Sequence, residues 1–201
     1  MPRKRSRRVT DSTWQTQVGA GIQIPSNSAR LLLSWGIGPY FKDRVVEPED
    51  MTFRRWQTGE AIAYTKLVPN FRETYDAPYF VIHRAHFHEA LCTLAVHLGV
   101  KIVTNSQVVS YDETLPSIKT ADGREYSADI ILAADGVKSI ARAVVLGGED
   151  MPAKRTGFAA YRAVVNTEEM QGDPDIAWML ERPRLNIWYV RVSHESKCRD
   201  L

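Results

Sequence analysis

An apolar run that leads directly into an Asp-Gly pair most constrains how this chain can fold. Five apolar residues, 130–134, follow Asp129; Asp135-Gly136 and a helix-like stretch to Leu146 come next. A strand that is apolar at every position is typical of a parallel sheet covered on both faces. The unit predicts an α/β fold, in which the turn and the helix N-terminus can bind a phosphate or a ribose. On these residues alone, a plain junction between strand and helix is an equally good interpretation.

The middle of the chain has further elements that such a fold needs. Apolar residues at intervals of three or four predict a helix over 85–98, which Gly99 ends, and a strand over 100–103. Three extended segments follow, and Ala121-Asp122-Gly123 is a turn signal between the last two. These segments predict a small β-meander over 108–127.

Shorter elements are expected on either side of this centre. Residues 1–17 have neither helical nor strand periodicity and are expected to be a loose, polar head. An extended piece over 22–24 and a short helix that Gly36 ends come next. Further along, the pattern predicts two short strands around Thr58-Gly59, a strand over 157–165, a short helix over 167–170 and strand-like pieces at 176–180 and 185–192.

Composition excludes several classes of protein. Hydrophobic residues make up 44% and charged residues 25% of the chain, which is typical of globular proteins. No apolar run approaches the ~20 residues that a membrane helix needs. Five of the 26 basic residues lie in the head. Without them the chain has 21 basic and 24 acidic residues, so nucleic-acid binding is not expected. Two cysteines exclude a disulfide scaffold and suggest a reducing compartment, so we expect a cytoplasmic protein.

Four segments, taken in order, carry a family resemblance. They are GAGIQIP at 19–25 with Asn27, VIHRA at 81–85 with Leu91, ADGVKS at 134–139 with Arg142, and YRA at 161–163 with WY at 188–189. Together they resemble the motifs of FAD-dependent aromatic hydroxylases, specifically the salicylate-hydroxylase-like monooxygenases of fungal metabolism. The likeness covers roughly residues 18–190.

The resemblance implies an α/β architecture in which parts of the family's fold are missing. It implies an incomplete FAD-binding domain of the Rossmann-like, glutathione-reductase type over 18–151, with the β-meander laid on it. The basic head over 1–17 stands before this domain, and the beginning of an α+β substrate domain occupies 152–201. The family's G-x-G-x-x-G does not occur among the 12 glycines. The family's later G-D segment continues with Ala-Ala-His, whereas Gly172-Asp173 comes too early and is followed by Pro174. We therefore expect a monooxygenase fragment that is truncated at both ends.

The resemblance also assigns residues to the cofactor. Ala20 and Gly21 are expected to lie against FAD, where a larger side chain would clash. Arg84, at a helix start, is expected to pair with the FAD phosphate or ribitol. Asp135 and Gly136 are expected to line the side of the crevice that faces FAD and the nicotinamide.

Two further residues are implied to act on the substrate. Arg162 and Tyr189 match an arginine and a tyrosine that lie over the substrate ring, where they position a phenolate and stabilise its charge. The alternatives are a surface or strand-edge arginine and a core tyrosine. The implied activity is hydroxylation of a small aromatic or phenolic substrate with FAD, NAD(P)H and O₂. A non-catalytic remnant or interaction protein derived from the family is the alternative function.

A metal site is not expected. His83, His86 and His88 are close in sequence, but few carboxylates accompany them. We interpret them as histidines at the helix end or on the surface.

Overall fold

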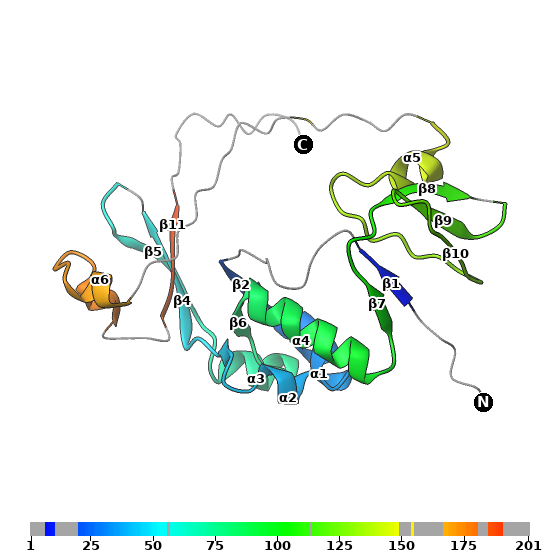
Figure 1. The fold of residues 1–201 in the computed structure, drawn as a ribbon. Coiled ribbons are helices and arrows are strands. Elements are labelled where there is room, and N and C mark those ends of the chain that lie inside the picture. Colours follow the sequence, from blue (N-terminus) through cyan, green and yellow to red (C-terminus); the bar gives the residue numbers. More distant parts are fainter. Residues whose placement is uncertain are drawn as a thin grey trace. The chain divides into compact units, whose positions relative to one another are not determined.

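The computed structural model describes residues 7–10, 20–55, 57–112, 114–148, 154, 167–180 and 185–190 of the chain. The chain divides into two compact units, Val18–Leu94 with Arg162–Leu201 and Met1–Gln17 with Ala95–Tyr161 (Figure 1). Among the described residues, no helix has the length and apolar character that a membrane span requires.

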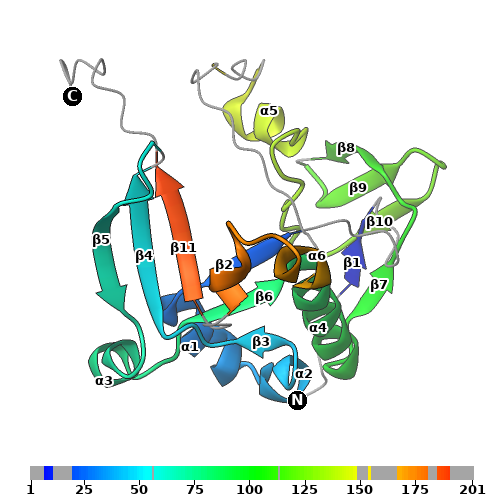
Figure 2. The ribbon, with the colours of Figure 1, turned by 90° about the vertical axis from the view of Figure 1, so that its left-hand side faces the viewer.

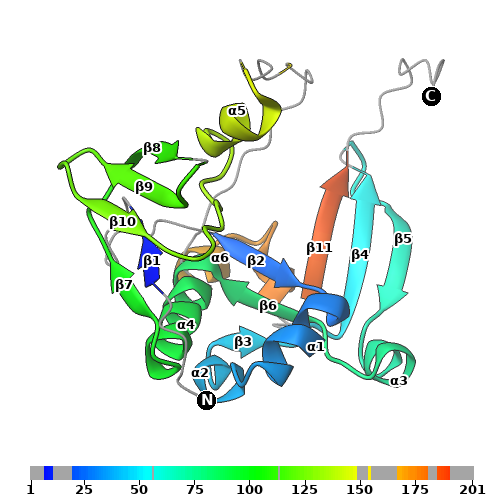
Figure 3. The same cartoon turned by 90° about the vertical axis from the view of Figure 1, so that its right-hand side faces the viewer.

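The first sheet of the Val18–Leu94 unit has three antiparallel strands. β6 (Phe80–His83) is central, between β2 (Gly21–Ile24) and β3 (Val45–Val46) (Figure 3). The expected helix after β2 is α1 (Ser26–Ser34), which ends before Gly36, a residue with a positive φ of 89°. The expected longer helix is α4 (Arg84–His97), and Gly99 follows it with a φ of 87°.

A continuous apolar core joins this sheet to its helices. Its buried residues come from β2, β6, α1, α4 and the short helix α2 (Gly38–Phe41), with Ile37 before it; they are Ile24, Ala29, Leu32, Ile37, Phe41, Ile82, Ala90 and Leu94. The ring of Phe41 lies 6.1 Å from Phe80 and 6.0 Å from Phe87, between centroids. Burial of these groups fixes α4 against the sheet.

A second sheet has the order β11-β4-β5 (Figure 2). β4 (Asp50–Arg55) pairs antiparallel with β5 (Ala61–Lys66), which confirms the two strands expected around Thr58-Gly59. β11 (Leu185–Val190) pairs parallel with β4.

Three further short helices among the described residues belong to the same unit. They are α3 (Asn70–Tyr75), α6 (Thr167–Gln171), which confirms the helix expected there, and a 3₁₀ helix over Ala177–Leu180. The expectation of a strand-like piece at 176–180 was wrong. A continuous apolar run of five residues does not separate a strand from a helical turn. The strand expected over 157–165 lies outside the described residues.

The other unit begins with a parallel pair of strands. β1 (Arg7–Val9) pairs with β7 (Lys101–Val103), and the N–H of Thr10 donates to the carbonyl of Val103 at 2.9 Å. The expectation that residues 1–17 are entirely loose was therefore wrong for this segment. Three residues are too few for periodicity to reveal a strand, and it is the backbone pairing with β7 that defines this one.

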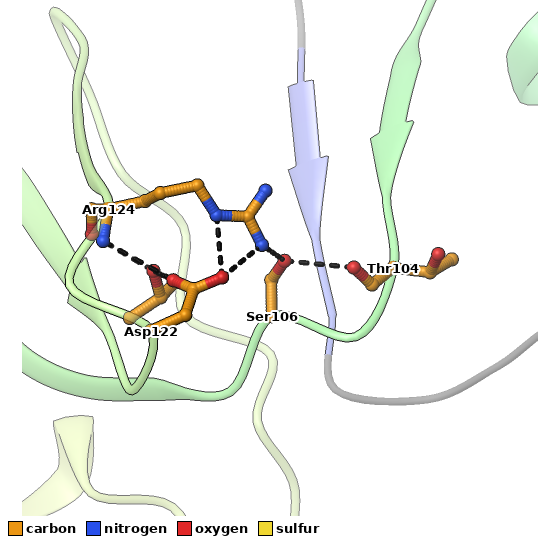
Figure 4. Close-up of polar contacts among 5 residues, drawn as sticks. Thr104, Ser106, Asp122 and Arg124 are labelled. Atoms are coloured by element: carbon orange, nitrogen blue, oxygen red, sulfur yellow. Dashed lines mark hydrogen bonds and ion pairs between the residues drawn. The ribbon is translucent and has the colours of Figure 1, made fainter.

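The expected β-meander is confirmed as β8 (Val108–Asp112), β9 (Ser117–Thr120) and β10 (Glu125–Ser127). Its turn carries a polar network (Figure 4). Arg124 Nε donates to Asp122 Oδ2 at 2.6 Å, and Arg124 Nη2 donates to Ser106 Oγ at 2.8 Å. Ser106 Oγ in turn donates to the carbonyl of Thr104 at 2.9 Å. These hydrogen bonds connect the β9–β10 turn to the segment between β7 and β8.

The expectation of a strand over 130–134 was wrong. Residues 128–136 form no helix or strand, and the side chains of Ile130 and Leu132 are 72% and 85% exposed. A strand that is apolar on both faces needs partner strands and covering helices, and among the described residues none pairs with this segment. The helix that follows is α5 (Ala141–Leu146), which begins later than the expected residue 137.

Candidate functional site

Three of the residues expected at the cofactor meet where β2 begins and α4 starts. Gly21 lies opposite His83 in the β2–β6 register. The N–H of Arg84 donates to the carbonyl of Ala20 at 3.1 Å, so the backbone of the helix start is joined to the backbone that precedes β2. We call Ala20, Gly21, His83, Arg84 and Ala85 the β2–α4 junction.

The side chain of Arg84 is exposed on this junction. Among the described residues, its guanidinium has no hydrogen-bond or ion-pair partner. Arg44 and Arg72 of the same unit differ, because they bind Glu89 at 2.7 Å and Glu47 at 2.6 Å. Arg84 is therefore a cation available to an external anion, and a guanidinium suits a phosphate or a carboxylate.

At Gly21 the backbone of the junction is exposed and carries no side chain. A Cβ placed on it would meet only Val81 Cγ1, at 3.8 Å, which is ordinary contact. Neither packing nor a positive φ within the chain requires glycine here. Because the residue is exposed and lacks a side chain, a flat ligand could approach the backbone closely at this point.

His83 was expected at the helix end or on the surface, and it lies immediately before α4; its hydrogen bond there was not predicted. Its Nδ1 accepts a hydrogen bond from the N–H of Ala85 at 3.3 Å. Its ring also lies 5.4 Å from that of His86, between centroids. A polar residue immediately before the first helical residue is the signal that could have identified an N-cap.

Asp135 and Gly136 lie in the other unit, in an exposed turn before α5. Asp135 Oδ2 accepts hydrogen bonds from the N–H groups of Ile140 at 3.1 Å and Ala141 at 3.3 Å. Hydrogen bonds from the Ser139 side chain and from these backbone groups hold the pKa of Asp135 below its usual value. The carboxylate therefore caps the start of α5, and Gly136 has a φ of 80°, which the turn itself requires.

Tyr111 is a second residue that sequence reasoning missed. Its hydroxyl donates to Asp135 Oδ2 at 3.4 Å. Burial, followed by the neighbouring charge of Asp135, raises the pKa of Tyr111. No local pattern links a residue at the end of β8 to the Asp-Gly turn, so this contact could only come from the structure.

Of the two residues expected at the substrate, one lies among the described residues. Tyr189 belongs to β11, where its backbone lies opposite Arg54 of β4. Arg162 lies outside the described residues. In the described part of the chain, no group of three or more His, Cys, Asp or Glu side chains could hold a metal ion.

Comparison with curated proteins gives a consistent set of relatives. No protein-family model matches the chain. It is 33% identical over 180 residues to the FAD-dependent monooxygenase OpS4 of Beauveria bassiana, covering 89% of this chain and 42% of that protein. It is 34% identical over 160 residues to the 3-hydroxybenzoate 6-hydroxylase of Klebsiella oxytoca, covering 78% and 40%. The chain thus spans about two fifths of the length of these relatives.

Comparison with solved structures agrees with these relatives. The crystal structure of FqzB matches with a TM-score of 0.70 at 24% identity, over 88% of this chain and 39% of that one. Klebsiella pneumoniae HpxO, in complex with FAD and uric acid, matches with a TM-score of 0.58 at 18% identity, over 73% and 43%. At these identities the likeness establishes the fold alone.

Proposed function

The chain is homologous to FAD-dependent monooxygenases and hydroxylases, and from this premise we propose that it contributes part of an FAD-binding domain to such an enzyme. The observation that carries the proposal is 33% identity maintained over 89% of the chain. The proposed domain covers residues 18–151 and has the glutathione-reductase type of Rossmann-like fold, and a substrate domain begins at 152. β7 of this domain belongs to a parallel pair, as strands of a Rossmann-like sheet do, although its partner β1 precedes residue 18.

The β2–α4 junction fits FAD. Arg84 offers an exposed guanidinium to a phosphate, and Gly21 offers backbone without a side chain. We propose that these two residues, together with Ala20, hold the cofactor. FAD, when bound, supplies the electron transfer and oxygen activation that amino-acid side chains lack.

By the family resemblance, Asp135 and Gly136 are also proposed as cofactor-binding residues. The carboxylate already accepts hydrogen bonds from the start of α5, which fixes its orientation. A carboxylate held in this way can accept a further hydrogen bond from a ribose or ribityl hydroxyl.

The proposed reaction is hydroxylation of a small aromatic substrate with NAD(P)H and O₂ in the cytoplasm. One relative, named above, is a 3-hydroxybenzoate 6-hydroxylase, which favours a phenolic substrate. Arg162 and Tyr189 are proposed to bind the substrate ring, where the arginine stabilises negative charge on the phenolate oxygen.

Flavin binding by the purified chain tests the proposal directly. After addition of FAD and removal of the excess, absorbance near ~450 nm should remain with the protein, because this band belongs to the flavin. Arg84→Ala should weaken FAD binding about tenfold or more, since charge-assisted hydrogen bonds to a phosphate are lost.

Arg30→Ala is the matched control. Arg30 is also an exposed arginine of this unit, on α1, and its removal should leave flavin binding unchanged. A wild-type chain that retains no flavin would contradict the proposal and favour the non-catalytic alternative.

A further inference from the structure

We infer that His83 is a positioning residue that sets the start of α4 and so holds Arg84 in place for the cofactor. The inference rests on the proposed function, because it concerns the same junction. Its basis is the hydrogen bond from the N–H of Ala85 to His83 Nδ1 at 3.3 Å. Arg84 is the first residue of α4, so His83 occupies the N-cap position and Ala85 the second helical position.

The contact fits the geometry of an N-cap. A capping side chain accepts a hydrogen bond from the second or third N–H of the helix, which has no partner within the helix itself. Oxygen of Ser, Thr, Asp or Asn usually performs this function. Here an imidazole nitrogen, Nδ1, is the acceptor instead.

The cap matters for Arg84 because the backbone on both sides of that residue is fixed. The N–H of Arg84 is bound to the carbonyl of Ala20, and the next N–H along the chain is bound to His83. On the strand side, His83 is paired with Gly21. The direction in which the Arg84 side chain leaves the helix is therefore determined by three consecutive residues.

The contact between the rings of His83 and His86 offers a competing explanation for a histidine at this position. The two rings are tilted by 56° with their centroids 5.4 Å apart. If packing were the reason, any ring of similar size would serve. If capping is the reason, an acceptor is required and the ring is not.

Two substitutions separate these explanations. His83→Asn keeps an acceptor at the N-cap and removes the ring, whereas His83→Phe keeps a ring and removes the acceptor. His97→Ala is the control, because His97 is an exposed histidine at the opposite end of α4. Each full-length variant is measured by amide hydrogen exchange at Ala85 and by titration with FAD, and its far-UV circular dichroism checks that it is folded.

Both measurements should depend on whether residue 83 provides a hydrogen-bond acceptor. In His83→Phe, exchange at Ala85 should become about fivefold faster, and the FAD dissociation constant should rise by a similar factor, as is typical when a cap is lost. His83→Asn and His97→Ala should match the wild type in both measurements.

Two results would overturn the inference. In one, His83→Phe matches the wild type; in the other, His83→Asn fails to restore FAD binding although Ala85 is protected. A wild-type chain that protects Ala85 but takes up no FAD would instead refute the proposed function, and the positioning role with it, while leaving the cap itself established. A His83→Phe chain that does not fold is replaced by His83→Leu, with the same expectations.

Discussion

The unit around α4 and the unit around the β-meander bury different kinds of side chain. In the first, most of the buried residues described are apolar, and eight of them form one core between the β2–β6–β3 sheet and its helices. In the second, the buried apolar residues described are Ile118 and Ala141, while the buried polar ones are Ser106, Ser117 and Thr120. The apolar residues of the 130–134 segment contribute little to its interior, because Ile130 and Leu132 are mostly exposed.

This difference explains why the helix predicted over 85–98 formed and the strand predicted over 130–134 did not. The helix over 85–98 was predicted correctly because its apolar partners on β2, β6 and α1 lie within the same unit. The 130–134 segment has an equally clear pattern, but a strand gains stability only from neighbours that pair with it. Periodicity shows which side chains of a segment can be buried, but it does not show whether another strand or helix is there to cover them.

The largest expected effect comes from replacing one isoleucine in each unit by alanine and comparing the loss of stability. Ile82→Ala should lower the free energy of unfolding of its unit by about 2–5 kcal/mol, because Ile82 is 2% exposed on the central strand. Ile130→Ala should change the free energy of unfolding by less than about 0.5 kcal/mol, because its side chain is mostly in solvent. Urea denaturation followed by circular dichroism measures both. A large loss for Ile130→Ala would mean that the 130–134 segment is packed in solution.

The candidate site was predictable to a different extent from the fold. The association of Ala20, Gly21 and Arg84 came from the family resemblance, since no periodicity connects a loop before β2 with the start of α4. The hydrogen bond from Arg84 to Ala20 supplies that connection. The acceptor role of His83 had a sequence signal, a polar residue immediately before a helix, whereas the contact of Tyr111 with Asp135 depends on side-chain orientation, which sequence patterns do not encode. The roles of all these residues toward FAD stay predictions.

A buried hydroxyl tests whether polar contacts hold the β-meander unit. Ser106 is 1% exposed and links Arg124 to the carbonyl of Thr104. Ser106→Ala should lower the free energy of unfolding of this unit by about 1–2 kcal/mol, since the partly buried carbonyl of Thr104 loses its donor and the Arg124 guanidinium loses one of its acceptors. Ser110→Ala is the control, because Ser110 is exposed on β8 and its loss should cost less than about 0.5 kcal/mol. Equal effects of the two variants would remove the network as an explanation.

The Asp-Gly turn should respond locally. Asp135→Ala removes the acceptor for the N–H groups of Ile140 and Ala141, so hydrogen exchange at these amides should become about fivefold faster. Asp129→Ala removes an exposed carboxylate of the same unit and should leave both rates unchanged. The exchange rates of α4 should be unaffected by either variant. If Asp129→Ala had the same effect as Asp135→Ala, a general charge effect would replace capping.

The smallest expected effect is a pH dependence confined to the same turn. Hydrogen bonds from Ser139 and from the start of α5 lower the pKa of Asp135, so its carboxylate stabilises the folded unit fully above the ordinary value of 3.8. That contribution should be lost as the pH falls through the lowered pKa, because a protonated carboxyl is a weaker acceptor. The amide signals of Ile140 and Ala141 in NMR spectra should therefore titrate with a midpoint below pH 3.8, and Asp135→Asn should abolish this titration. A midpoint at or above 3.8 would mean that the cap does not form in solution, and the turn before α5 would then differ still more from the capped start of α4.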